Sequence, residues 1–195
     1  MNDPWNTTLA QLLSTGFPHL KSSVLPVLGS KISISVPTRL DQKALEAASD
    51  SHYQVVISKQ GFTGEFSGSC FLVMEERASS CCSEMYANHE EEEQEDIDQE
   101  DCCKEFMNIA TNALISKIDD ELGCDHDYTF PEFFRGNSPA LIKELLEKHN
   151  YGYAYQSTIS FVKLVKIRAD LIYGFTEQEM QKMKDFCQRV RRKAS

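Results

Sequence analysis

The 195-residue sequence lacks the features of an exported or membrane-spanning protein. Its apolar runs, such as residues 70–74, are far shorter than the ~18 residues that a membrane-spanning helix needs. Residues 1–5 have neither the basic start nor the apolar stretch of a secretory signal. We therefore expect a cytoplasmic protein.

Positive charge is also scarce, with 20 Lys and Arg against 30 Asp and Glu and a net charge of -10. Nine of the acidic residues lie within 88–101, and the other 21 nearly balance the bases. Binding to nucleic acid or to an anionic membrane needs concentrated positive charge, so we expect neither partner. Like charges at this density repel one another, so 88–101 is predicted to be an acidic, flexible insert.

The seven cysteines include no Cys-x-x-Cys pair, and their number is odd. A disulfide framework is therefore not expected in a cytoplasmic chain, and small buried side chains are the simpler interpretation. The run Cys124-Asp125-His126-Asp127 leaves open a metal or redox site. A helix end followed by a polar turn explains these four residues better, so no metal is expected.

Periodicity and turn residues divide the chain into alternating helices and strands. Up to the acidic insert, we predict a helix capped by Thr7 or Thr8 and broken near Gly16, a strand at 31–36, a β-hairpin of strands 53–58 and 66–75 with its turn at 61–64, and a short helix at 77–86. After it, we predict a helix at 102–122, a strand at 128–134 interrupted by Pro131, a helix at 138–149 opened by a capping residue, strands at 151–155, 158–167 and 171–173, and a C-terminal helix with a basic end at 176–195.

The helix at 102–122 has one apolar and one polar face. At 3.6 residues per turn, Phe106 and Met107 belong to the apolar face, whereas Glu105, Asn108 and Asn112 lie on the opposite side. Asn is a poor helix former, less favourable than Ala or Glu by several tenths of a kcal/mol, and a purely solvated face has no reason to use it twice. This local conflict makes the polar face a candidate functional site.

Residues 104–113, KEFMNIATNA, resemble the Glu-x-x-Asn helix of the CheC/CheX family of chemotaxis phosphatases, with Glu105 and Asn108 at the two motif positions. The surroundings match in order, with a glycine-rich hairpin at 61–68 upstream and a Pro-x-x-x-x-Gly strand at 130–136 downstream. The resemblance covers roughly residues 7–136, and the single motif is more similar to CheX than to CheC. Asn112 stands where the family commonly has Gly.

The resemblance implies a single CheX-like domain over residues 1–195, of the α+β class. We expect an antiparallel or mixed sheet of about five or six strands with two long helices packed on one face, plus the C-terminal helix. CheX-like proteins form homodimers through sheet edges, so a homodimer is expected.

The implied function, in two-component signalling, is hydrolysis of the aspartyl phosphate of a phosphorylated CheY-like receiver domain of a response regulator. The acyl phosphate, its Mg²⁺ and a lysine would all belong to that partner, so no cofactor is expected on this chain. Asn108 would position the attacking water, and Glu105 would pair with the partner's lysine. The alternative is a non-catalytic CheX-like module that binds a response regulator or dimerises.

Overall fold

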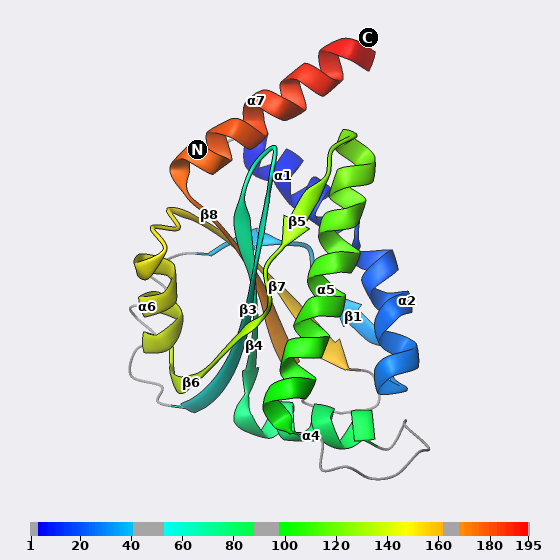
Figure 1. Ribbon diagram of the computed structural model, residues 1–195, viewed down its shortest axis with the longest axis vertical. Helices are drawn as coiled ribbons and strands as arrows, with labels where there is room; N and C mark the ends of the chain where they lie inside the picture. Colours follow the sequence, from blue (N-terminus) through cyan, green and yellow to red (C-terminus); the bar gives the residue numbers. More distant parts are fainter. Residues whose placement is uncertain (1–3, 41–52, 88–97, 162–167, 195) are drawn as a thin grey trace.

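The computed structural model describes residues 4–40, 53–87, 98–161 and 168–194. It contains a curled β-sheet with helices on both faces (Figure 1). The strands are β1 (Ile32–Ile34), β2 (Thr38–Arg39), β3 (Tyr53–Gly64), β4 (Gly68–Glu75), β5 (His126–Tyr128), β6 (Glu132–Ser138), β7 (Tyr153–Phe161) and β8 (Arg168–Phe175). The helices are α1 (Pro4–Ser14), α2 (Phe17–Leu28), α4 (Glu76–Ala87), α5 (Gln99–Leu122), α6 (Ala140–Lys148) and α7 (Glu177–Ala194).

Every described strand pair is antiparallel, in the order β1-β7-β8-β4-β3-β5. The short strand β2 lies beside β7, and β6 lies beside β3 on the same edge as β5. Because side chains alternate across a strand, Val56 of β3 faces one core while Val55 and Ile57 face another. The expected α+β fold, with an antiparallel sheet, long helices on one face and a C-terminal helix, is confirmed, but the sheet in the described residues has eight strands rather than five or six.

The larger core lies between the sheet and the helices α1, α2, α4 and α5, and α7 contributes Met180 and Met183 to it. The smaller core lies under α6 on the other face. In Figure 1, α5 and α2 run side by side over the first face. A Cβ on Gly16 would lie 2.6 Å from Cα of Leu114, so the break between α1 and α2 lets the chain pass close to α5.

Helix α5 forms largely as the sequence predicts. Its apolar side is buried throughout, including Phe106 and Met107, and Gly123 ends it with a left-handed φ of 65°. Its start differs from the prediction, because Asp98 caps the helix by accepting a hydrogen bond from the Glu100 amide at 3.3 Å. Residues 98–101 therefore belong to the helix and its cap, whereas residues 88–97 of the predicted insert lie outside the described residues.

The predicted turn at 61–64 is wrong, because β3 continues to Gly64 and the hairpin turns at residues 65–67. The glycines serve close packing instead. A Cβ on Gly64 would lie 2.7 Å from the ring of His126, and Gly61 exchanges hydrogen bonds with Thr129.

Several other predicted boundaries also shift. Helix α1 begins at Pro4 rather than at Thr7 or Thr8, and helix α6 follows Pro139 without a side-chain cap. The two strands predicted at 151–155 and 158–167 are one strand, β7, as far as Phe161, and residues 162–167 lie outside the described residues. The cap of α7 is confirmed, since the Glu179 amide donates to Oγ1 of Thr176 at 3.2 Å. None of the helices in the described ranges combines the length and the apolar character needed to cross a membrane.

Candidate functional site

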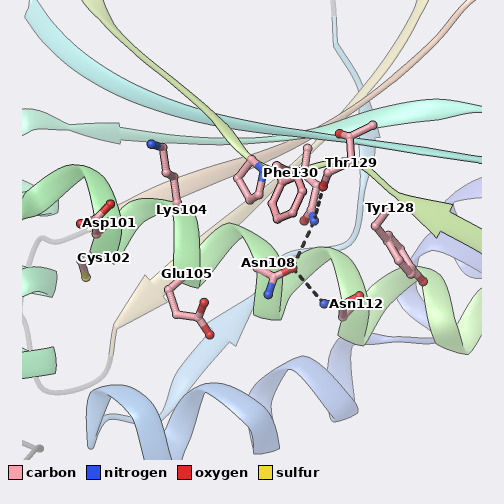
Figure 2. Close-up of a pocket in the computed structure, with 11 residues that line it drawn as sticks. Asp101, Cys102, Lys104, Glu105, Asn108, Asn112, Tyr128, Thr129 and Phe130 are labelled. Carbon is pink, nitrogen blue, oxygen red and sulfur yellow. Dashed lines mark hydrogen bonds between the residues drawn. The ribbon is translucent and has the colours of Figure 1, made fainter.

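The polar side of α5 borders a groove. This hollow, of about 830 Å³, lies between α5 and the segment that joins β5 to β6. Figure 2 shows Glu105, Asn108 and Asn112 along α5, with Thr129 and Phe130 across from Asn108. The strand predicted at 128–134 with an interruption at Pro131 is divided between two strands, because β5 ends at Tyr128 and β6 begins at Glu132, and Pro131 lies in the segment between them.

Glu105 and Asn108 both reach the groove, as the helical wheel predicts. The Glu105 side chain is exposed, and its carboxylate has no hydrogen bond or ion pair with any of the described residues. Lys104, the adjacent cation, is held by Glu100 at 2.5 Å, and this hydrogen bond raises the pKa of Lys104. Glu105 therefore presents an uncompensated negative charge to anything that enters the groove.

Asn108 is half-buried, and a chain of hydrogen-bonded amides fixes its orientation. Nε2 of the buried Gln60 donates to the Thr129 carbonyl at 2.9 Å and to Oδ1 of Asn108 at 3.1 Å. Nδ2 of Asn112 donates to the same Oδ1 at 3.1 Å. A carbonyl oxygen can only accept, so Thr129 identifies Nε2 of Gln60 as a donor and the facing atom of Asn108 as an oxygen.

This chain of hydrogen bonds determines what Asn108 can offer. Both lone pairs of Oδ1 are engaged, whereas the two N–H groups of Nδ2 have no partner in the described part of the chain. Figure 2 shows this nitrogen turned away from Thr129. The groove therefore presents a fixed pair of N–H donors beside a free carboxylate.

The remaining polar groups of the groove are poor nucleophiles. Burial raises the pKa of the Cys102 thiol, and burial together with nearby Asp119 raises the pKa of Tyr128 to about 12. Both groups are therefore neutral at physiological pH, and the described lining includes no histidine. The site can therefore position and hydrogen-bond a reacting group, and neither its thiol nor its phenol is an activated nucleophile.

Gln60, Thr129 and Phe130 were not identified as site residues from the sequence. Phe130 is 94% exposed and stands at the rim of the groove, next to Pro131. Its only signal in the sequence was its place at the start of the Pro-x-x-x-x-Gly segment. Nothing in the pattern around Gln60 distinguishes it from any other polar residue in a strand.

At the other end of α5, the structure brings Cys124 and His126 together with Asp119. Asp125 and Asp127, the other two members of the run in the sequence, are exposed. The expected helix end is present, but the run does not form a plain polar turn, because the Cys124 and His126 side chains turn toward the helix.

Comparison with known proteins identifies the family of this chain. The family described as "Chemotaxis phosphatase CheX" matches residues 56–153, about half of the 195-residue chain, and this region contains both Glu105 and Asn108. The chain therefore belongs to the CheX family. A search of curated protein sequences finds no match.

Solved structures with the same fold include a FliY protein and several CheX proteins. FliY of Thermotoga maritima is 14% identical with a TM-score of 0.69, over 96% of this chain and 98% of its own. CheX of Desulfovibrio desulfuricans is 10% identical with a TM-score of 0.59, over 84% and 97%. The CheX-CheY-BeF3-Mg+2 complex from Borrelia burgdorferi matches at 16% identity with a TM-score of 0.56, over 84% and 97%. At such identities these likenesses show the fold alone.

Proposed function

We propose that this protein is a phosphatase that accelerates hydrolysis of the aspartyl phosphate of a CheY-type receiver domain. The observation that carries the proposal is the fixed carboxamide of Asn108 beside the free carboxylate of Glu105, both open to the groove. Membership of the CheX family supports it, as does the structural likeness to a CheX bound to CheY.

Hydrolysis of the aspartyl phosphate requires only that this chain position a water molecule. Water attacks the phosphorus as the bond to the receiver's aspartate breaks, the carboxylate leaves, and the water's proton ends on the released phosphate. Nδ2 of Asn108 donates to one lone pair of the water and leaves the other directed at phosphorus. An amide cannot remove a proton, so Asn108 acts by positioning. The Mg²⁺ required for such a reaction is expected on the receiver.

Glu105 lies one helical turn from Asn108. It contributes a negative charge for docking and takes no part in the bond-breaking step. Its free carboxylate would pair with the receiver's lysine and set the register in which the two proteins dock. Phe130, exposed on the opposite rim, would be covered by the same docking.

The second candidate function is a module that binds a response regulator without hydrolysing its phosphate. One observation favours it: Asn112 stands where the family commonly has Gly, and its donated hydrogen bond occupies the second lone pair of Asn108 Oδ1. Asn108 could then accept nothing from a water molecule unless its contact with Asn112 opened.

A panel of the host's receiver domains separates the two functions. Each receiver is phosphorylated, and phosphate release is followed with and without this protein, while binding is measured on the beryllofluoride form. The phosphatase proposal expects faster release from at least one receiver that also binds, whereas binding without acceleration supports the second function. Absence of both contradicts each of them. The homodimer remains a prediction, which sedimentation of the purified protein tests.

A further inference from the structure

Three side chains with metal-binding atoms meet where α5 ends and β5 begins. Gly123 turns the chain back, and the amides of Gly123 and Cys124 donate to the Asp119 carbonyl at 2.7 and 3.2 Å. Nδ1 of His126 lies 2.5 Å from Oδ1 of Asp119, and Sγ of Cys124 lies 3.5 Å from the same oxygen. The three ligand atoms all lie within 4.8 Å of one another.

We propose that Asp119, Cys124 and His126 bind one divalent transition-metal ion, with zinc as the ion that this ligand set suits best. Imidazole, thiolate and carboxylate are the common protein ligands of Zn²⁺, and three of them with a water complete a tetrahedron. The ionised Asp119 and Cys124 would together neutralise the charge of the ion.

One of the three distances between ligand atoms already suits a tetrahedral ion, and the others would have to adjust. With zinc–ligand bonds of about 2.0–2.3 Å, a sulfur and an oxygen ligand stand about 3.5 Å apart, which is the separation of Cys124 and Asp119. Nitrogen and oxygen ligands stand about 3.3 Å apart, so the 2.5 Å contact between His126 and Asp119 would have to widen. Nδ1 of His126 and Sγ of Cys124 lie within 4.8 Å of each other, and an ion would hold them about 3.5 Å apart.

The last turn of α5 is rich in carboxylates. Carboxylates at a helix C-terminus oppose the macrodipole, yet the last turn of α5 contains Asp119, Asp120 and Glu121 and no basic residue. Lys117, one turn earlier, pairs with Asp120. Asp125 adds negative charge next to Cys124, whereas Glu65, which also lies near this thiol, is paired with Arg189 at 3.8 Å. A bound cation would relieve this repulsion.

His126 is held rigidly beside Asp119. Its side chain is fully buried, and its ring packs against Phe62 and Phe66 with centroids 5.6 and 4.4 Å away. Nδ1 is the ring atom that faces Asp119, and Nε2 has no hydrogen-bond partner within the described residues. Such a fixed ring loses little freedom on binding an ion.

The site is structural rather than part of the phosphatase chemistry. Asp119 is 14 residues from Glu105 on α5, which is about 21 Å along the helix. An ion there would tie the end of α5 to β5, and the segment after β5 carries the Thr129 carbonyl that orients Gln60. The ion would thus stabilise the frame of the groove without touching the reacting phosphate.

Metal titration of the purified full-length protein, stripped of metal and kept reduced with a phosphine, tests the proposal. We expect Zn²⁺ to bind with one-to-one stoichiometry and to raise the melting temperature. Co²⁺ should give a thiolate-to-cobalt charge-transfer band. Cys124→Ser should abolish the band and weaken Zn²⁺ binding at least tenfold. His126→Gln, checked for folding by circular dichroism, should weaken binding likewise.

Cys81→Ser is the matched control, because Cys81 is also a half-buried free thiol but belongs to the cysteine pairs of α4 and α5. It should keep both the band and the affinity. The proposal is overturned if the wild-type protein binds no Zn²⁺ stoichiometrically, if Cys124→Ser binds as the wild type does, or if Cys81→Ser loses the ion. None of these results depends on phosphatase activity, so they leave the proposed function to its own test.

Discussion

Helix α5 carries a cluster of polar side chains near each end, and the first cluster is open to solvent whereas the second is enclosed. Near its start, Asn108 is oriented by Gln60 and Asn112 while its own N–H groups stay free beside the exposed Glu105. Near its end, Asp119 and His126 bond to each other, and the histidine is enclosed by aromatic rings. Substitutions at the open end should therefore change activity with little effect on stability, and substitutions at the closed end should do the reverse.

The largest expected effect on stability is at the closed end. Gly64→Ala places a Cβ 2.7 Å from the His126 ring and even closer to the Asp125 carbonyl, so it should lower the free energy of unfolding by about 1–3 kcal/mol. Urea denaturation measures this loss. Phosphate release, assayed well below the unfolding temperature, should stay near the wild-type rate.

Gly152→Ala is the control, because a Cβ at Gly152 would meet no atom within 4 Å. It should leave the unfolding free energy within about 0.5 kcal/mol of wild type. Equal stability of the Gly64 and Gly152 variants would show that the closed end is not tightly packed around His126.

At the open end, Phe130→Ala should weaken docking without destabilising the fold. Full burial of a Phe side chain is worth about 2 kcal/mol, which corresponds to a KM about 30-fold higher with kcat unchanged. Because Phe130 is 94% exposed, stability should not change measurably. Val36→Ala, at another exposed apolar residue, should leave KM unaltered; equal KM values for the two variants would remove Phe130 from the docking surface.

Gln60→Leu tests whether the amide chain orients Asn108. Without Gln60, Oδ1 of Asn108 keeps only the hydrogen bond from Asn112, so the Asn108 carboxamide is held less firmly. We therefore expect kcat to fall about tenfold, which corresponds to about 1.4 kcal/mol, with KM unchanged. Asn112→Ala removes the second donor, and a double variant that loses more than the sum would show that the two act together. Unchanged kcat in Gln60→Leu would mean that Asn108 does not depend on this orientation.

The smallest predicted effect involves the ion pair behind the groove. Nζ of Lys59, whose side chain is 9% exposed, lies 2.7 Å from Glu132, and this hydrogen bond lowers the pKa of Glu132. A depressed carboxyl pKa stabilises the fold above the unfolded value of about 4.3, and the contribution is lost as the pH falls through the folded value.

Because Glu132 is 57% exposed, Glu132→Gln should cost only about 1 kcal/mol at pH 7 and less at pH 3, which lies below the unfolded pKa of about 4.3. Urea denaturation at the two pH values measures the difference. A cost that is the same at both would mean that the pair does not depend on the charge of Glu132.

Patterns of local periodicity were enough to predict α5. Burial of Phe106 and Met107, exposure of Glu105 and the stop at Gly123 all follow from a period of 3.6 and a left-handed cap. The general class of fold also followed, because the order of helices and strands resembles that of the family.

Features that depend on long-range contacts could not be predicted in this way. Gly61 and Gly64 indicated a turn, but they are needed where β5 and the segment after it pack closely on β3. The bond from Gln60 to Thr129 joins residues 69 positions apart, and no local pattern specifies it. The cluster at Asp119 likewise depends on the turn after Gly123, which brings His126 back against the helix.

Single-turnover phosphate release from a phosphorylated receiver, with this protein in excess, tests the central claim most directly. The wild type should accelerate release, and Asn108→Ala should lose about 10²–10³ of that acceleration, or ~3–4 kcal/mol, while it still binds the receiver. Its unfolding free energy should stay within about 1 kcal/mol of wild type, because better helix propensity offsets the lost hydrogen bonds. Equal acceleration by wild type and Asn108→Ala, or none by wild type on any receiver that it binds, would contradict the assignment of Asn108 as the group that positions water.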